Sequence, residues 1–395
     1  MAQLNQKLVI LVFADYYLPG FKAGGPIRTL ANMLSQLEGE FHFKIVTRDR
    51  DLGDSAKYIS VITEKWIKHG DHEILYVDPS KFGFLSVVDL IRNTSFDVLY
   101  LNSFFSYWAT ILPLFAKHLF ANRAERVILA PRGEFAAGAL NISRKKKLVY
   151  FKIVSILGIY NNVTWQASST NEFQDIANCI AKYLGIQRDE MNIKIAPNLI
   201  PANEMARTNL SLLQTTVYLR IVFLSRIVPM KNLDFLIDVL SKVKDKVVLN
   251  IYGPIENQGY WELCEEKMKT FGDNVSYSYG GIVDHQDVAA RLSESDVFFL
   301  PTRGENFGRI IFESMAAGVP AVISDKTSWE ADPNGALTVL PLEVDLWVNE
   351  IHKWSQRSQE ERNMLRQKAL DYASDYSSKS DAYQKNVNLF LQNNQ

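Results

Sequence analysis

Two glutamates eight positions apart, Glu305 and Glu313, are the residues of this sequence with the clearest chemical potential. They lie in the stretch 300–320, which reads as a buried strand, a polar loop, a helix and a stop. Carboxylates accept hydrogen bonds from sugar hydroxyls, and this spacing puts one of them in the loop and the other about two turns into the helix. Two acceptors can therefore face one ligand from different distances.

The residues between the two glutamates predict an anion site. Asn306, Phe307 and Gly308 stand where the helix begins, so their backbone N–H groups and the positive end of the helix dipole can hold phosphate oxygens. Glycine at 308 lets the anion approach closely. Taken alone, the segment equally describes a capped surface helix with solvated glutamates.

Two cations upstream, Arg226 and Lys231, follow an apolar run at 218–225 and precede an amphipathic stretch. A phosphate-type leaving group gains negative charge as the bond to it breaks. Arginine can stabilise that charge through its planar fork and lysine as a point charge, so that no metal is required. The alternative is a basic residue that caps a strand and a lysine in solvent.

Two strand exits in the N-terminal half also carry candidate residues. Gly24 and Gly25 follow the first apolar run, where glycine permits positive φ and close backbone approach. Arg132 and Glu134 follow the run 126–130 and are expected at a cleft, where they would orient an acceptor. The alternative for this second pair is ion pairing with neighbouring charges.

Together these segments resemble the retaining glycosyltransferases of the GT-B fold, glycosyltransferase family 4, also called glycosyl transferases group 1. The resemblance rests on the two glutamates, the intervening Asn-Phe-Gly, the following Ala-Ala-Gly-Val-Pro and the upstream arginine and lysine. It implies that Glu313 binds the nucleotide ribose and that Glu305 faces the donor sugar. It also implies that the amides of Phe307 and Gly308 meet the diphosphate.

The same resemblance gives roles to the remaining candidates. Arg226 and Lys231 match the family's cations on the diphosphate, and the Gly24-Gly25 loop is similar to the acceptor-domain loop that reaches the donor when the domains close. Many members carry a histidine near position 132. This chain has Arg132, similar to a subset that reads Pro-Arg-Gly, so the family's histidine contact to the donor sugar has no counterpart here.

The distribution of short apolar runs predicts the fold class. Runs that alternate with amphipathic stretches are typical of parallel strands covered on both faces. We predict an α/β protein of the GT-B fold, with two Rossmann-like doubly wound domains facing a central cleft. The predicted parts are an acceptor-binding domain at 1–200, a nucleotide-sugar-binding domain at 201–375 and a C-terminal helix at 376–395 that crosses back to the first domain. The predicted strands are at 8–13, 43–46, 98–101, 126–130, 163–167, 193–196, 218–225, 247–252, 275–277, 297–300 and 321–324.

The composition limits the classes of protein to which the chain can belong. With 395 residues, 47% hydrophobic and 22% charged, the chain is long enough for two soluble domains. The net charge of -1 gives no field that would attract nucleic acid. Cys179 and Cys264, both in predicted helices, support neither a disulfide framework nor a cysteine-rich metal site, which fits a reducing cytoplasm. We find no secretion signal and no apolar run long enough to span a membrane.

Three weaker features are interpreted as follows. Asp49-Arg50-Asp51 and the stretch 69–72 have metal-binding residue types, but each is predicted to be a polar loop, and we expect no metal and no cofactor. The basic cluster 144–147 precedes an apolar and aromatic helix face. This segment predicts either peripheral contact with the anionic cytoplasmic face of the inner membrane or a buried core with a solvated charge run. The aromatic run 104–108 lines an acceptor cleft or packs in the core.

These features lead to one predicted function and two alternatives. By the resemblance, the enzyme transfers a hexosyl unit with retention from a nucleoside diphosphate sugar to a hydroxyl of a glycan or lipid-linked glycan, in the biosynthesis of a surface polysaccharide such as lipopolysaccharide. A UDP-sugar is the expected donor, and a GDP-sugar is the second candidate. The alternatives are a nucleotide-sugar epimerase or phosphorylase on the same fold, and a non-catalytic subunit that binds the sugar nucleotide.

Overall fold

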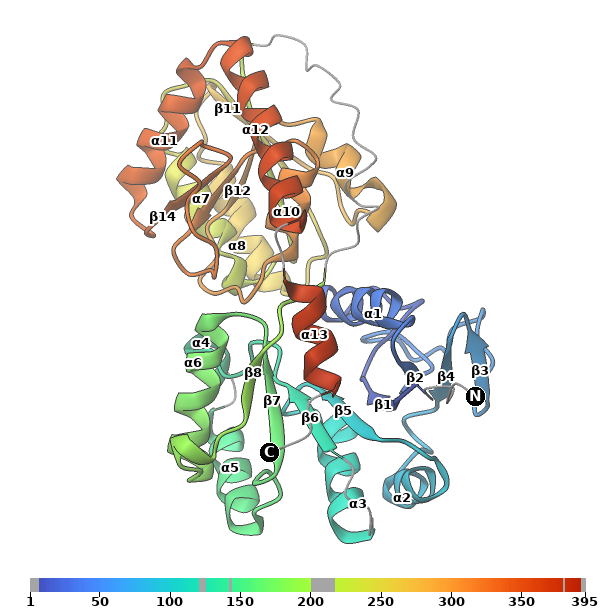
Figure 1. Cartoon of the computed structure of the whole chain (residues 1–395). Helices are drawn as coiled ribbons and strands as arrows, with labels where there is room; N and C mark the ends of the chain where they lie inside the picture. The colour runs from blue at the N-terminus through green and yellow to red at the C-terminus, as the bar shows by residue number, and fades with distance from the viewer. Residues whose placement is uncertain (1–6, 121–125, 142–143, 200–216, 379–380, 392–395) are drawn as a thin grey trace. The chain divides into compact units, whose positions relative to one another are not determined.

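The computed structural model describes residues 7–120, 126–141, 144–199, 217–378 and 381–391. The chain divides into two compact units, one of residues 1–200 with 381–395 and the other of residues 201–380. Each unit contains one mostly parallel sheet with helices packed against it (Figure 1). The predicted α/β fold class with two Rossmann-like units is therefore confirmed. The predicted boundary at 200 and 201 falls on residues outside the described ranges.

The N-terminal sheet has eight strands, and all of its neighbouring strands are parallel except β3 and β4. Its central strands are buried on both faces, which is what apolar runs of this kind predict for a parallel sheet. The strand order is β3 (Trp66–His69), β4 (His72–Val77), β2 (His42–Arg48), β1 (Val9–Phe13), β5 (Val98–Asn102), β6 (Arg126–Ala130), β7 (Val163–Ala167) and β8 (Ile193–Ile195).

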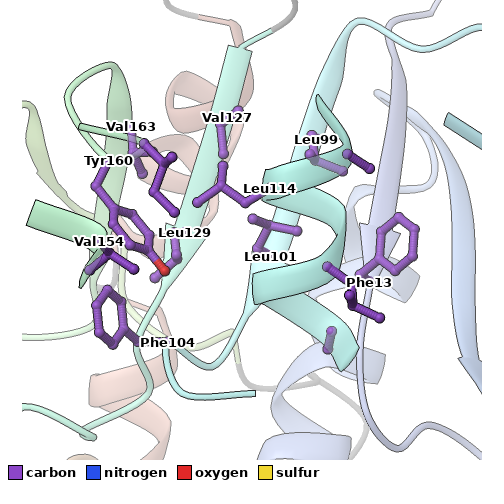
Figure 2. Packing of buried hydrophobic residues seen from close by; sticks show 14 of the residues in the cluster. Phe13, Leu99, Leu101, Phe104, Leu114, Val127, Leu129, Val154, Tyr160 and Val163 are labelled. Carbon is purple, nitrogen blue, oxygen red and sulfur yellow. The ribbon is translucent and has the colours of Figure 1, made fainter. Parts of the chain in front are cut away.

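Helices cover both faces of this sheet. One apolar cluster joins the sheet to α1 (Gly25–Leu37) and α13 (Ala382–Leu391), and another joins the opposite face to α2 (Phe84–Asn93), α3 (Leu112–Phe120) and α5 (Arg144–Leu157). The second cluster also takes in α6 (Thr170–Cys179) and the π-helical turn η2 (Ile180–Leu184). Figure 2 shows Leu114 of α3 beside Leu101 of β5 in this second cluster.

The C-terminal sheet has six strands, and all of its pairings are parallel. Helices α7 (Leu233–Leu240), α8 (Gln258–Met268) and α11 (Val344–Gln356) pack as one group, and α9 (His285–Ser293), α10 (Arg309–Ala316) and α12 (Gln359–Ser378) as another. The strand order is β11 (Val275–Tyr279), β10 (Val247–Tyr252), β9 (Leu219–Leu224), β12 (Val297–Leu300), β13 (Ala321–Ser324) and β14 (Leu337–Leu340).

Every predicted strand is present, and the structure adds three. These are β3, β4 and β14, short strands at or next to a sheet edge. The stretch 69–72, predicted to be a solvated loop, is the turn between β3 and β4, and His72 is only 6% exposed. That prediction is wrong for His72, because this residue begins β4, which lies between β3 and β2 in the sheet. At the other end of the chain, residues 376–378 close α12, and α13 begins at Ala382.

The acidic loop after β2 also differs from its prediction. Asp49 and Asp51 are buried, whereas a polar solvated loop was expected. Asp51 accepts hydrogen bonds from the backbone N–H groups of Phe21 (2.7 Å) and Lys22 (3.1 Å). Its carboxylate therefore fixes the loop that leads into α1. Among the described helices, none is long and apolar enough to cross a bilayer.

Candidate functional site

The strand order of the C-terminal sheet places its candidate residues. The chain runs from β9 outward through β10 to β11, and then returns to β12 on the other side of β9. Open parallel sheets bind ligands at such a reversal, outside the carboxyl ends of the strands. Lys231 follows β9 and Glu305 follows β12. Both residues therefore lie at the position where this fold binds ligands.

An ion pair joins the two loops across this reversal. Lys231 Nζ donates a hydrogen bond to Glu305 Oε2. Lys231 closes the short 3-10 turn Pro229–Lys231, and the side chains of Lys231 and Glu305 are 11% and 19% exposed. Because both groups are largely withdrawn from water, their charges are weakly screened. The pair thus holds a cation ready at the carboxyl edge of the sheet.

The N-terminus of α10 lies directly beside this pair. Gly308 caps the helix with φ +63°, and a Cβ at this position would stand 2.7 Å from Glu305 Cγ and 2.7 Å from Ile311 Cδ1. Within the described residues, the N–H groups of Phe307 and Gly308 donate no hydrogen bond to a protein acceptor. Free amides at the positive end of a helix are suited to bind an anion.

The loop that carries these amides is held from the segment after β13. Ser328 Oγ donates to the carbonyl of Asn306 at 2.6 Å, and Trp329 Nε1 donates to the carbonyl of Phe307. The rings of Phe307 and Trp329 also pack together, with their centroids 5.3 Å apart. These contacts fix the two carbonyls toward the protein, so the amides keep their orientation.

Glu313 lies in the second turn of α10, with its side chain 17% exposed. Arg309 Nε donates to Glu313 Oε1 at 2.6 Å, and His285 Nε2 lies 3.8 Å from the same oxygen. His285 opens α9 just beyond β11, and the packing of α9 on α10 brings it to the site. Sequence reasoning missed His285, although its place after a strand at the carboxyl edge was a usable signal.

Arg226 stands apart from the other charged candidates. Its NH1 atom bonds Glu256 Oε2 at 3.1 Å, in the loop after β10, and its side chain is 46% exposed. In the part of the chain that the structure describes, no hydrogen bond links Arg226 to Lys231 or Glu305. The structure therefore brings Lys231 and Glu305 together and leaves Arg226 beside a different glutamate.

In the N-terminal unit, the predicted glycine loop does cap a helix. Gly24 has φ +73° at the N-cap of α1, and Gly25 is the first helical residue. A Cβ on either glycine would meet no atom within 4 Å. Packing therefore does not require glycine at position 25, whereas the positive φ favours glycine at position 24.

Glu134 acts as an internal acceptor. Its Oε2 accepts the backbone N–H groups of Phe104 (2.5 Å) and Phe105 (3.1 Å), and its Oε1 accepts the hydroxyl of Ser103 (2.6 Å). Burial raises the pKa of the Glu134 carboxyl above its usual range. Glu134 thus fixes the loop after β5, and its role toward an acceptor stays a prediction.

Arg132 is held by neutral oxygens. Its guanidinium donates to Asn102 Oδ1 (3.1 Å from NH2), Asn198 Oδ1 (3.1 Å) and the hydroxyl of Tyr100 (2.8 Å). The pairing with charged neighbours that the sequence left open is absent from the described ranges. Arg132 also has φ +55°, a backbone angle that residues other than glycine rarely adopt and that is often found at functional sites.

No group of three or more His, Cys, Asp or Glu side chains that could hold a metal ion occurs among the described residues. The two cysteines are free and buried, Cys179 in α6 and Cys264 in α8. Burial raises the pKa of each thiol to about 12. Neither thiol is therefore suited to act as a nucleophile.

Comparison with known proteins agrees with this geometry. The family model described as Glycosyl transferases group 1 matches residues 215–371, which lie in the C-terminal unit. A curated Klebsiella pneumoniae protein, described as an uncharacterized 41.2 kDa protein in cps region, is 24% identical over 323 residues. The match covers 78% of this chain and 82% of that protein.

Two solved structures are similar over nearly the whole chain. HepE from Anabaena, in complex with UDP and glucose, superposes with a TM-score of 0.65 at 16% identity, covering 97% of this chain and 98% of HepE. WaaG, a glycosyltransferase involved in lipopolysaccharide biosynthesis, gives 0.59 at 14% identity, covering 98% and 100%. The chain thus carries a glycosyl transferases group 1 domain and has the GT-B fold.

Proposed function

We propose that this glycosyltransferase is a retaining enzyme of family 4 that transfers a hexosyl unit from a nucleoside diphosphate sugar to a hydroxyl of a glycan or lipid-linked glycan. The observation that carries the proposal is the Lys231–Glu305 pair beside the glycine-capped N-terminus of α10. This arrangement puts a cation, free amides and a carboxylate at one edge of the sheet. A diphosphate joined to a sugar needs all three.

The donor is held by residues of the C-terminal unit. The diphosphate accepts hydrogen bonds from the amides of Phe307 and Gly308 and from the ammonium of Lys231. Glu305 accepts hydroxyls of the sugar, and Glu313 those of the ribose. Arg309 and His285 lie against one oxygen of Glu313 and orient its carboxylate.

Arg226 supplies a second cation at the rim of the same site. Its side chain is exposed enough to turn from Glu256 toward a bound diphosphate. A UDP-sugar is favoured as the donor, because HepE, which has the same fold, is described in complex with UDP and glucose. A GDP-sugar is the second candidate.

The bond that breaks joins the anomeric carbon to a diphosphate oxygen, and the bond that forms joins this carbon to the acceptor oxygen on the same face. The departing diphosphate accepts the acceptor's proton, so no protein base is assigned. Lys231, Arg226 and the helix amides stabilise the charge that develops on the leaving group, and Glu305 positions the sugar. This scheme requires neither a metal nor a cofactor.

The acceptor class is proposed from the relatives. One is encoded in a cps region, and WaaG is described as acting in lipopolysaccharide biosynthesis. A role in building a surface polysaccharide follows, with the enzyme at the cytoplasmic face of the membrane that carries the growing glycan. Arg132 and Glu134, at the carboxyl edge of the N-terminal sheet, are the proposed acceptor-side residues.

A transfer assay tests the proposal. UDP-hexoses and GDP-hexoses are incubated with EDTA and a panel of lipid-linked glycan acceptors, and the anomeric configuration of the product is read by NMR. The expected result is an α-linked product from one nucleotide class, with wild-type protein and not with Lys231→Ala. Conversion of the donor to an epimer without any acceptor would support the epimerase alternative. Donor binding without turnover across the whole panel would support the non-catalytic subunit.

A further inference from the structure

Helix α5 in the N-terminal unit has a composition that its own fold does not explain. Its 14 residues carry five cations and no acidic residue. Four of the cations occupy the first turn, at the positive end of the helix dipole, where acidic side chains stabilise a helix and basic ones destabilise it. The cations are Arg144, Lys145, Lys146, Lys147 and Lys152.

The outer face of α5 is also unusually apolar. Phe151 and Val154 are buried against the sheet, whereas five large aliphatic side chains on the same helix are exposed. Exposed apolar groups gathered on one helix mark a contact surface. The exposed residues and their exposed fractions are Leu148 (39%), Val149 (62%), Ile153 (51%), Ile156 (78%) and Leu157 (44%).

A pocket of about 230 Å³ opens beside the first turns of α5. Three of its lining residues are the cations Arg144, Lys147 and Lys182, the last from η2. Its aromatic part consists of Phe151 and Tyr183, whose rings are stacked with their centroids 4.7 Å apart. The pocket thus combines positive charge with an apolar floor, and Leu148 connects it to the exposed face of α5.

Two cations of this pocket, Arg144 and Lys182, form no ion pair in the described part of the chain, and the charge of Lys147 interacts with the carboxylate of Glu134. Lys147 Nζ donates to the carbonyl of Ala139 at 2.7 Å and lies 4.5 Å from the ring centroid of Phe105. Lys182 Nζ lies 5.1 Å from the ring centroid of Tyr183. No described ion pair includes Lys147, Lys182 or Arg144. Two cations without an ion-pair partner, with Lys147 beside them, predict an anionic ligand with several acceptor oxygens.

We propose that α5 lies on an anionic lipid bilayer and that the adjoining pocket binds the phosphate of a lipid headgroup. The exposed aliphatic side chains then enter the boundary between headgroups and acyl chains, while the outer lysines face neighbouring anionic lipids. An acidic protein partner would match the charge but not the five exposed aliphatic side chains. The inference rests on the proposed function only in one respect, namely that a membrane-bound acceptor explains why the enzyme binds lipid.

Vesicle binding of the full-length protein tests this inference without any turnover. Binding is measured by co-sedimentation with vesicles of phosphatidylcholine alone and of phosphatidylcholine with phosphatidylglycerol. Each cation near an anionic surface contributes about fivefold to binding. The pocket variant Arg144→Gln/Lys182→Gln should therefore bind the anionic vesicles more than about 30-fold more weakly than wild type, because it loses this attraction and its direct contacts to the headgroup phosphate as well. The variant Ile153→Ser/Ile156→Ser should also lose binding.

Two matched controls separate the pocket from diffuse attraction. Lys65→Gln/Lys68→Gln removes the same charge elsewhere in the unit and should bind like wild type. Lys145→Gln/Lys152→Gln removes it from α5 outside the pocket, and its loss should be smaller than that of the pocket variant. Thermal melts by circular dichroism check that each variant is folded.

Three results would overturn the inference. One is equal binding of neutral and anionic vesicles by the wild type, and another is an equal loss in the two α5 charge variants. The third is binding of inorganic phosphate without binding of vesicles, which would identify a free anion as the ligand. A failed transfer assay would leave the vesicle result unchanged, so the two proposals can fail separately.

Discussion

Two pairs of acidic residues, one pair at the carboxyl edge of each sheet, have different hydrogen-bond partners. In the N-terminal unit, Asp51 and Glu134 accept hydrogen bonds from backbone N–H groups and fix the loops around them. In the C-terminal unit, Glu305 and Glu313 bond to the side chains of Lys231 and Arg309. These two pairs of acids therefore differ in whether they shape a loop or bond a cation, while other acids at the N-terminal edge do form ion pairs, among them Asp15 with Arg48.

The candidate cations at the two edges also differ in their partners. Arg132 at the N-terminal edge has neutral partners, whereas Lys231 and Arg226 at the C-terminal edge each bond a glutamate. A lysine paired with a carboxylate can exchange part of that contact for a phosphate without moving far. The comparison predicts that substitutions at the C-terminal edge impair donor use and that substitutions at the N-terminal acids impair stability.

The largest expected effect comes from Lys231→Ala. Removing a cation from the leaving group should lower the turnover number about 100- to 1,000-fold, as loss of a transition-state hydrogen-bond donor does in other enzymes. The release of nucleoside diphosphate with donor and acceptor present measures it. A folded variant with unchanged turnover would contradict the assignment of Lys231 to the diphosphate.

The next largest effect is on stability and comes from Glu134→Ala. Three donors in the loop after β5 lose their acceptor, which should lower the free energy of unfolding by about 3 kcal/mol. Urea unfolding followed by tryptophan fluorescence measures the loss. If this variant kept wild-type stability, the contrast between the two edges would fail.

A smaller effect is expected from Gly308→Ala. The left-handed conformation and the short contacts to Glu305 and Ile311 should lower the free energy of unfolding by about 1–2 kcal/mol and weaken nucleotide binding. Gly25→Ala is the matched control, because its Cβ meets no atom within 4 Å. It should leave the free energy of unfolding within about 0.5 kcal/mol of wild type. Equal losses in both variants would contradict the account of the α10 cap.

The smallest effect is a pH dependence. Because burial raises the pKa of Glu134 in the folded state, the native protein binds its proton more tightly than the unfolded chain does. The stability that this group contributes is present below its unfolded pKa and is lost as the pH rises through the folded pKa. Glu134→Gln stays neutral and keeps an acceptor for the two amides.

Wild type should therefore lose stability relative to Glu134→Gln as the pH rises from 4.5 through the folded pKa, by about 1.4 kcal/mol for each unit of pKa difference. Urea unfolding of both proteins at several pH values measures this difference. A difference that stays constant, or that moves the other way, would show that the carboxylate is not destabilised by its burial.

Much of the fold could be predicted from sequence because most strands are continuous apolar runs. β10, β12 and β13 have the predicted bounds. The short strand β3 could not be predicted in this way, since pairing with β4, rather than local periodicity, fixes it. β4 and β14, in contrast, contain runs at 74–77 and 337–340 of the same kind as the predicted strands, and these were signals that we overlooked.

The candidate site was likewise predictable only in part. The loop and helix around Gly308 were predictable because their residue types are local signals. The contact between Lys231 and Glu305, which are 74 positions apart, follows from the placement of β12 next to β9 and from no local pattern. The backbone partners of Glu134 were hidden for the same reason, because they lie 29 and 30 positions away.

Calorimetric titration with UDP in the presence of EDTA tests most directly the claim that the C-terminal edge holds the nucleotide. Wild type should bind UDP without metal, and Glu313→Ala should bind it at least about 10-fold more weakly, because a hydrogen bond to a charged group contributes about 1.5–3 kcal/mol net. If UDP and GDP both fail to bind in EDTA, or if Glu313→Ala binds like wild type, the proposed donor site is wrong.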